Sequence, residues 1–403
     1  MVARCASTPS TRARVSLGLS VALVTPGGLA QRGGMGSASR VLVDASRGHG
    51  LNWRVLDPWR GPFRLFQLGA TAAALGRLVG LALRRRVDVV HVNMAAGGSL
   101  AREGLFVLAA RALRRPCIVH LHGSRLDHTY ARLPRPLRAA FRALLRSADA
   151  VVTLGSAWRH FALDVLGLEW ERVHAIANGV PEPTPVDRPG PGSPVRILFV
   201  GRLGERKGSA TLLEAVSRPE LHGLDWTLTL AGDGELATAE RLAGALGVGD
   251  RCACVGWLDA TDVARLMAGS DILVLPSRHE GLPMAVLEAM AHGLAVVTTR
   301  AGALADAIVP DETGLVVAAD APRELAAALR RLVERPELRW RLGAAARQRY
   351  LDQFTDTRMA GAFALLYAET VARHAAERAF ASRPGLPRGG RAAAALARPQ
   401  QIG

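Results

Sequence analysis

The chain of 403 residues is 49% hydrophobic and 21% charged, and it contains 42 glycines. This length allows two domains with a core each, and four cysteines in so long a chain exclude a disulfide-rich framework. The net charge of +16 is uneven: residues 1–190 hold 26 Arg against 11 acidic residues, whereas residues 191–377 hold 20 basic and 24 acidic residues. The cationic first half predicts an anionic partner, such as a membrane surface, a lipid phosphate or a nucleic acid.

Strands and helices are predicted to alternate along the first half. Short apolar runs predict buried parallel strands, and longer periodic stretches between them predict helices. Strands are expected at residues 15–24, 51–56, 87–92, 117–121, 149–154 and 173–176, with helices at 65–85 and 100–113. Arginines ahead of residues 15–24 are typical of a secretory signal, but no small-x-small cleavage site follows, which favours a strand. No uninterrupted apolar run reaches 18 residues, so no membrane-spanning helix is expected.

A proline-rich segment divides the chain. Residues 181–194 contain six prolines, which indicates a linker. Beyond it, strands are expected at residues 196–200, 227–230, 251–255, 272–275, 295–298 and 314–317, and a long amphipathic helix at 356–379. Two rounds of strand–helix alternation predict an α/β protein of two Rossmann-like domains facing each other across a cleft. The expected parts are a flexible N-terminus 1–14, a first domain 15–180, the linker 181–194, a second domain 195–350, a C-terminal helix 351–380 packing back toward the first domain, and a disordered basic tail 381–403.

The chain has a single lysine, Lys207, in the segment Gly201-Arg-Leu-Gly-Glu-Arg-Lys-Gly208. This segment follows the strand expected at residues 196–200, and its glycines let backbone and cation approach an anion closely. A lysine ammonium binds phosphate as a point charge. Lys207 is therefore a candidate phosphate ligand, and an ordinary surface lysine in a strand–helix loop is the alternative.

Residues 272–293 carry the strongest local pattern. A strand ends at residue 275, a polar loop follows, Pro283 suits the start of a helix, and Gly293 suits its end. Glu280 then lies in the loop at the carboxyl end of a strand, where α/β sheets bind ligands.

Two carboxylates flank the start of this predicted helix. Glu288 lies about five residues into the helix, beyond Glu280, and the free backbone N–H groups around Gly281 and Leu282 could hold a diphosphate. Hydroxyl-binding groups on both sides of an anion site suit a nucleotide sugar. The alternative is one glutamate that stabilises the helix dipole and a second that is solvated.

Glu280 and Glu288, with seven residues between them, Pro276-Ser277 before and Gly281-Leu282-Pro283 after, resemble the signature of family 4 retaining glycosyltransferases with the GT-B fold. Further segments resemble the same family in the right order over residues 195–320, namely 201–208, 231–235, 255–258 and Gly302 with 312–315. The resemblance is looser in the first half, where Gly33-Gly-Met-Gly36 and His120-Leu-His-Gly-Ser124 match the family's glycine loop and histidine segment.

The resemblance implies a role for each matched residue. Arg202 and Lys207 would hold the diphosphate, while Glu280 would bind a sugar hydroxyl. His122 would reach the sugar from across the cleft, with Asp127 and His128 as weaker neighbours in its loop. The implied nucleotide-sugar-binding residues are Gly34, Gly36, Gly201, Val255, Trp257, Leu258, Gly281, Leu282, Pro283 and Glu288, with Glu288 on the ribose and Gly33, Gly34 and Gly36 in a loop that closes over the phosphates or the acceptor.

The expected chemistry uses neither metal nor cofactor. No Asp-x-Asp motif occurs, so protein cations and the helix start would stabilise the leaving diphosphate. No carboxylate nucleophile stands out, so we expect the acceptor hydroxyl to attack on the same face. The glycines at residues 33–36 begin too far beyond the first strand for a dinucleotide-binding turn.

A basic helix is predicted at residues 134–147. Arginines at 135, 138, 142 and 146 would share one face, with Leu137, Phe141, Leu144 and Leu145 on another. Such a helix can lie on an anionic membrane. The alternative is a surface helix whose apolar face packs into the core.

Taken with the resemblance, these features predict a metal-independent retaining glycosyltransferase that transfers a sugar from a nucleoside-diphosphate sugar to a glycan or lipid-linked acceptor in bacterial surface polysaccharide biosynthesis. We expect a cytoplasmic protein, peripheral to the inner membrane face, without a nucleic-acid partner. A nucleotide-sugar epimerase of the same architecture and a non-catalytic module that binds anionic surfaces remain alternatives. Nucleoside diphosphate released only in the presence of an acceptor would distinguish transfer from epimerisation.

Overall fold

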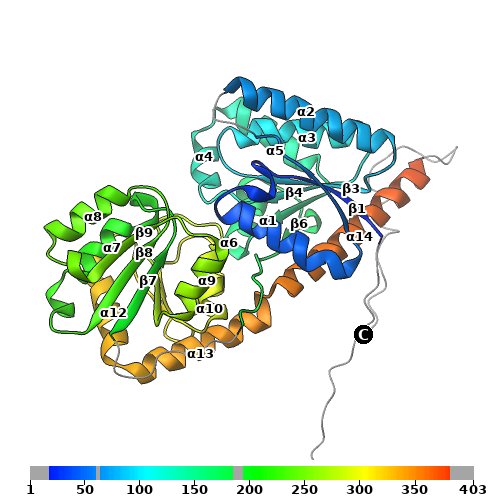
Figure 1. Cartoon of the computed structure of the whole chain (residues 1–403). Helices are drawn as coiled ribbons and strands as arrows, with labels where there is room; N and C mark the ends of the chain where they lie inside the picture. The colour runs from blue at the N-terminus through cyan, green and yellow to red at the C-terminus, as the bar shows by residue number, and fades with distance from the viewer. Residues whose placement is uncertain (1–17, 60–63, 185–193, 382–403) are drawn as a thin grey trace, which may run out of the picture.

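The computed structural model describes residues 18–59, 64–184 and 194–381 (Figure 1). Two α/β domains lie side by side, and a long C-terminal helix runs from the second back along the first. The expected N-terminus 1–14, most of the expected linker and nearly all of the expected basic tail lie outside the described residues.

The first domain is built on a six-stranded parallel sheet of order β2-β1-β3-β4-β5-β6. Its strands are β1 Ser20–Val24, β2 Asn52–Leu56, β3 Val89–Met94, β4 Cys117–Leu121, β5 Ala150–Thr153 and β6 Val173–Ala175. All six strands expected from apolar runs are confirmed. The central strands are buried throughout, because helices cover both faces of the sheet.

Helices α1 Gly34–Ala45, α2 Arg64–Leu83, α3 Ser99–Ala112, α4 Leu126–Arg132, α5 Arg135–Arg146 and α6 Ser156–His160 complete this domain. Alternate residues of the strands face opposite layers. One layer packs α2, α3 and α5 against the side of the sheet that carries Val24 and Val92. The other packs α1 against the side that carries Val21 and Ile118.

The second domain repeats the design with a parallel sheet of order β12-β11-β10-β7-β8-β9. Its strands are β7 Val195–Val200, β8 Trp226–Ala231, β9 Cys252–Gly256, β10 Ile272–Leu275, β11 Ala295–Thr298 and β12 Leu315–Val316, again as expected. Its helices are α7 Ser209–Val216, α8 Leu236–Ala245, α9 Ala260–Ala268, α10 Met284–Ala291, α11 Leu304–Ala307, α12 Pro322–Glu334 and α13 Pro336–Gln353.

The C-terminal helix α14 Asp356–Ala381 leaves the second domain and packs on the first. Backbone hydrogen bonds join Val180 to Phe354 and to Asp356, so the two crossing segments run together. Phe363 and Tyr367 are then fully buried against the first sheet. This helix therefore completes the core of the first domain with residues from the far end of the chain.

The two domains also touch where their sheets end. The backbone N–H of Ser156, after β5, donates to Asp306 Oδ2 at 2.6 Å, and the Ser156 hydroxyl donates to the same carboxylate. A Cβ on Gly155 would overlap Asp306. The loops after the strands of both domains thus face each other, and the candidate site lies among them.

Candidate active site

A buried ion pair joins two loops of the second domain. Lys207 Nζ lies 2.6 Å from Glu280 Oε1, and the two side chains keep 11% and 5% of their surface exposed. Lys207 ends the short 3-10 helix Glu205–Lys207 after β7, while Glu280 follows β10, the neighbouring strand. Because a buried charge is costly unless it is paired, the pair fixes these two loops to one another.

Glycines allow the lysine loop to approach β10. Gly208 has a φ of +72°, and a Cβ there would overlap the Pro276 carbonyl oxygen. The stem of Lys207 runs over Gly201, where a Cβ would lie 3.4 Å from Lys207 Cε. Glycine adopts this left-handed conformation without strain, so the Gly208 turn sets the position of the preceding lysine.

Two arginines of this loop differ in position. Arg206 NH1 lies 3.9 Å from Glu280 Oε2 and donates to the His279 carbonyl oxygen at 3.3 Å. Arg202 is 69% exposed and lies 3.9 Å from Asp233 Oδ2, beside the loop after β8. Arg206, which was not among the expected site residues, is therefore the arginine next to Glu280. Arg202 pairs with Asp233 rather than with Glu280.

Residues of the first domain lie against the backbone after Glu280. Asn178, which precedes the linker, donates from Nδ2 to the Leu282 carbonyl oxygen at 2.9 Å. A Cβ on Gly281 would lie 3.5 Å from the His122 carbonyl oxygen of the first domain. The segment Gly281–Leu282 therefore lies at the boundary between the domains.

The same segment leaves backbone donors available. The Gly281 carbonyl oxygen accepts from the N–H of Ala303 at 2.8 Å, but among the described residues the N–H groups of Gly281 and Leu282 find no acceptor. Pro283 caps α10, which follows directly. Unpaired N–H groups at a helix start attract anions, so a diphosphate would suit this position.

Glu288 lies in the second turn of α10, as the spacing predicts. Burial raises the pKa of its carboxyl from 4.5 to about 7. No charged partner contributes to that shift. A half-buried carboxyl whose pKa is raised without a charged partner is a candidate ligand contact.

His122 follows β4 and is tied to polar groups inside the first domain. Its Nε2 lies 3.2 Å from Asn93 Oδ1 and 3.1 Å from His120 Nδ1. Burial lowers the pKa of His122 to about 3, with His91 adding to the effect. The ring is therefore uncharged at neutral pH.

A chain of hydrogen bonds assigns the His122 proton. Ser39 Oγ donates to the Met35 carbonyl oxygen at 2.8 Å, so the same oxygen accepts the 2.9 Å bond from Asn93 Nδ2. The Asn93 amide is then oriented with its oxygen toward His122, whose Nε2 carries the proton. Nδ1 is left as an acceptor, and none of the described side chains bonds to it.

The glycine segment of the first domain is helical rather than a loop. Gly33 has a φ of +103° and precedes α1, whose first turn contains Gly34 and Gly36. A Cβ on Gly36 would overlap the Gln31 carbonyl oxygen, so the helix turns back on the preceding loop only with glycine there. The expected loop at residues 33–36 is wrong from Gly34 onward.

Side chains from the first domain reach the segment after β9. The Arg32 guanidinium stacks 4.2 Å from the ring centre of Trp257. Val255 and Trp257 are 42% and 44% exposed, and Leu258 packs against the second core. An exposed indole under a cationic plane can accept another flat group, as a base-binding position requires.

A second cross-domain contact lies beside Glu280. His128 of α4 meets His279 with ring centres 4.6 Å apart. Burial, together with His128 and Arg125, lowers the pKa of His279. Both histidines therefore lie where the two domains meet, with Asp127 next to His128.

Two cavities open at the same edge of the second sheet. One of about 400 Å³ is lined by residues that include Ser277, Thr299 and Arg300, and another of about 170 Å³ lies over Gly204 and Ser209 at the start of α7. Neither contains Lys207 or Glu280. In the described part of the chain, no cluster of three or more His, Cys, Asp or Glu residues could hold a metal ion.

The structure selects the second of the two alternatives for the basic helix and bears on the membrane expectation. In α5, Phe141 and Leu145 are buried, while Leu137 is 54% exposed, so most of the apolar face packs into the core. By length and composition, one described stretch, Phe66–Leu83 in α2, could cross a membrane. The sequence analysis excluded such a helix because polar residues interrupt the run, although its mean hydropathy is 1.4.

Comparisons with known proteins agree with this fold. Residues 186–349 match the family model of glycosyl transferases group 1, and residues 10–179 match that of the glycosyl transferase 4-like domain. The chain belongs to the glycosyltransferases and has the GT-B fold of two Rossmann-like domains.

Two relatives and one solved structure illustrate the similarity. A 2-deoxystreptamine glucosyltransferase of Streptomyces kanamyceticus is 30% identical over 66% of this chain and 73% of its own length. The lipopolysaccharide core glycosyltransferase LpsE of Rhizobium meliloti is 34% identical over 55% of this chain and 65% of its own. Anabaena HepE, solved in complex with UDP-glucose, superposes with a TM-score of 0.67 at 19% identity, covering 88% of this chain and 99% of its own.

Sequence reasoning missed several residues of the site. Asn93 and Ser39 orient His122, and Asn178 and Arg206 hold the Glu280 loop. Arg206 is adjacent to Lys207 and could have been suspected. The other three carry no motif, because their partners lie far away in the chain.

Proposed function

We propose that this protein is a retaining, metal-independent glycosyltransferase that moves a sugar from a nucleoside-diphosphate sugar to a hydroxyl of a glycan or lipid-linked acceptor. The observation that carries the proposal is the Lys207–Glu280 pair beside the unpaired N–H groups of Gly281 and Leu282. A buried cation and a helix start stabilise negative charge that develops on a leaving diphosphate. The UDP-glucose bound to HepE supports this substrate class.

Each site residue has a proposed role. Lys207 neutralises the diphosphate together with Arg202, whose side chain is exposed in the neighbouring loop. Glu280 accepts a hydrogen bond from a hydroxyl of the transferred sugar, and Glu288 does so from the ribose. The acceptor nitrogen of His122, Nδ1, binds a second sugar hydroxyl from the opposite domain.

The stereochemistry follows from the proposed site. The leaving diphosphate occupies the face of the sugar beside α10. The acceptor hydroxyl attacks on that same face as the anomeric carbon–oxygen bond breaks, and its proton passes to the departing phosphate oxygen. The anomeric configuration is retained.

Bacterial surface polysaccharide assembly in the cytoplasm is the proposed setting. The similarity to LpsE supports this setting, and so does the cationic first half. Thermal-shift measurements over a panel of nucleotide sugars would identify the donor. Acceptor-dependent release of nucleoside diphosphate in the presence of a chelator, with a product of unchanged anomeric configuration by NMR, is the expected result.

Two outcomes would contradict the proposal. Sugar interconversion without any acceptor would favour an epimerase. Stabilisation by none of the nucleotide sugars would favour a non-catalytic module.

A further inference from the structure

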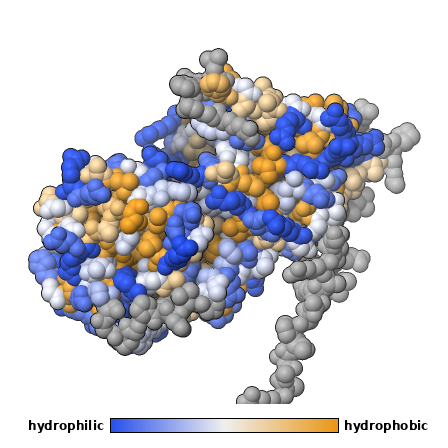
Figure 2. Space-filling view, in the orientation of Figure 1, coloured by the Kyte–Doolittle hydropathy of each residue, from blue (hydrophilic) through white to orange (hydrophobic). Residues whose placement is uncertain are grey.

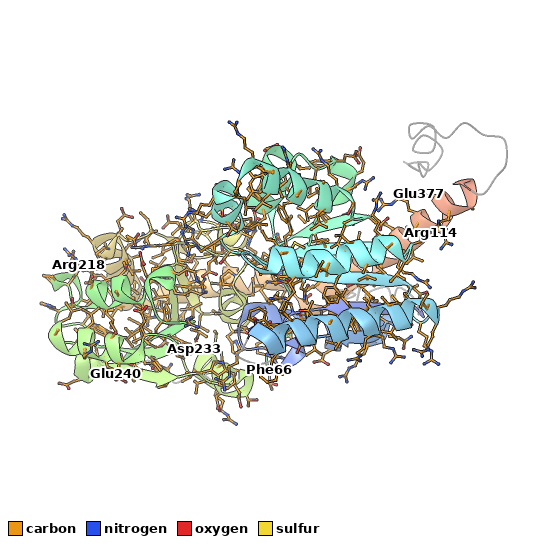
Figure 3. All side chains as sticks on the ribbon, turned by 90° about the horizontal axis from the view of Figure 1, so that it is seen from above. Phe66, Arg114, Arg218, Asp233, Glu240 and Glu377 are labelled. Atoms are coloured by element: carbon orange, nitrogen blue, oxygen red, sulfur yellow. The ribbon has the colours of Figure 1, made fainter. Side chains whose placement is uncertain are left out.

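One face of the first domain is apolar and turned to solvent. Helices α2 and α3 lie side by side across it (Figures 1 and 3). Hydrophobic residues gather along the upper edge of this domain, where α2 lies (Figure 2). Only 22% of the apolar stretch Phe66–Leu83 is buried. A large exposed apolar surface marks an interaction site.

The buried side of α2 limits how this helix can contact a membrane. Thr71, Ala74, Leu78 and Ala82 are spaced along one side, and each keeps at most 8% of its surface exposed. Leu78 and Ala74 belong to the domain core. If α2 left this core to cross a membrane, the core of the first domain would be exposed. The helix is therefore placed to lie along a membrane rather than to cross one.

Large apolar side chains are exposed at both ends of α2 and along α3. Leu68 and Leu83 of α2 are 70% and 72% exposed, and Phe66 is 65% exposed. Leu105 and Leu108 of α3 are 46% and 52% exposed. We call these five side chains the leucine face.

Positive charge accompanies the leucine face. Arg84, Arg85 and Arg86 follow α2 and are exposed, as is Arg114 after α3. Residues 64–86 contain no acidic side chain. Apolar area beside unopposed arginines is complementary to a bilayer with anionic headgroups.

We propose that the leucine face docks on an anionic lipid bilayer, with its leucines at the boundary of headgroups and acyl chains and Arg84–Arg86 on the anionic headgroups. In the view from above, Phe66 and Arg114 lie toward opposite ends of this surface (Figure 3). The docking goes beyond the proposed sugar transfer, and either can fail while the other holds.

A second copy of the chain is the other conceivable occupant. Gly76 has open space around it on α2, and small residues allow helices to pack closely. The arginines oppose such pairing, because two copies would bring like charges together. The bilayer is thus the favoured occupant.

Co-sedimentation of the full chain with vesicles tests the docking. We expect binding to phosphatidylglycerol vesicles that weakens with salt, and little binding to phosphatidylcholine. Leu68→Ser with Leu83→Ser should weaken binding by about tenfold or more. The matched control is Leu365→Ser on α14, since Leu365 is 61% exposed and lies outside the leucine face.

A second set of variants tests the charges. Replacing Arg84, Arg85 and Arg86 by Gln should weaken binding by about fivefold for each arginine, on the order of 100-fold together. Arg241, Arg265 and Arg323 of the second domain, which are also exposed, provide a control with the same change in net charge. The control should keep most of the binding.

The outcomes separate the occupants. The docking would be overturned if the serine variant still bound vesicles. It would also be overturned if the two triple arginine variants lost binding equally. A lipid-free dimer that light scattering detects and that the serine variant abolishes would assign the leucine face to a second copy. Transfer to a soluble acceptor, measured in the same variants, should stay unchanged and so tests the proposed function separately.

Discussion

Lys207 and Glu280 are 73 positions apart in the chain, yet their charged atoms lie 2.6 Å apart in a site almost closed to solvent. Each belongs to a different loop, and each was a candidate ligand contact on separate grounds. Their pairing makes the lysine loop and the glutamate loop one unit. Substitutions in one loop should therefore act on the other.

The pairing predicts an energetic coupling. Lys207→Met leaves Glu280 as a buried charge with only Arg206 nearby, which should lower the free energy of unfolding by about 3 kcal/mol. Adding Glu280→Gln should restore most of that loss, because the uncompensated charge is removed. Urea unfolding of the two single variants and the double variant measures the coupling. Additive losses would show that the side chains are not paired in solution.

Lys207 also predicts a loss of turnover. In the Glu280→Gln background, where the fold is expected to tolerate the change, Lys207→Met should lower transfer by a further 100- to 1,000-fold, on the order of the effect of removing one charge-stabilising donor. Steady-state kinetics with the identified donor provides the measurement. Arg218→Met, at a distant surface ion pair, is the control and should leave the rate unchanged. Near-normal transfer without Lys207 would refute its assigned role.

Asn93 predicts a positioning effect that acts through His122. Asn93→Ala removes the acceptor that holds the Nε2 proton, so His122 is free to change its tautomer and orientation. Losing this hydrogen bond, which is worth about 1.5 kcal/mol, should lower kcat about tenfold. In a His122→Ala background, Asn93→Ala should have no further effect on kcat. A further tenfold loss there would mean that Asn93 acts independently of the histidine.

Glu288 predicts a pH dependence of stability and binding. Its pKa is raised from 4.5 to about 7 in the folded chain, so the fold binds the extra proton between these values. The raised pKa adds about 3 kcal/mol to the free energy of unfolding below pH 4.5, and this contribution should be lost as the pH rises through 7.

Glu288→Gln should remove this slope, which thermal unfolding at several pH values can detect. If the ionised carboxyl binds the ribose, the KM for the donor should also fall as the pH rises through 7 in the parent protein, and stay flat in the variant. An identical pH slope of stability in both proteins would show that Glu288 does not titrate in this range.

Gly302 lies against the Glu280 loop, so a larger residue at this position should displace the loop. Its φ is +57°, and a Cβ there would overlap the Glu280 carbonyl oxygen. Gly302→Ala should therefore displace the loop and destabilise the fold by more than 2 kcal/mol.

Gly223 offers a matched control, because its φ is +72° but its surroundings are open. Gly223→Ala should cost about 1 kcal/mol, the strain of the backbone alone. Equal destabilisation by the two substitutions would mean that the Glu280 loop does not require Gly302.

Local patterns were sufficient to predict much of this fold. Most strands in the described part of the chain are short apolar runs between turn residues, a pattern that can be read from neighbouring residues alone. The start of α10 at Pro283 and its end before Gly293 were also predictable, since cap residues act within one turn. The first turn of α1 was not, because Gly33, Gly34 and Gly36 favour a loop by propensity, and the close approach of Gly36 to Gln31 exists only in the folded domain.

The apolar face of a helix shows a second limit. In α5 the arginines and leucines alternate regularly, yet Phe141 and Leu145 pack inside. In α2 the outer side is apolar, although Arg77 and Gln67 interrupt the pattern. Whether an apolar side faces core or solvent depends on which elements cover it, and this depends on the whole domain.

By itself, the sequence determined two strand–helix repeats and the loops in which the proposed phosphate- and sugar-binding residues lie, because these features depend on residues close together in the chain. The tertiary structure alone decided that Lys207 meets Glu280, that Ser39 and Asn93 orient His122, and that α14 returns to complete the first core. Such contacts join segments that are distant in the chain. Their geometry follows from how sheets and helices pack, and no local pattern encodes it.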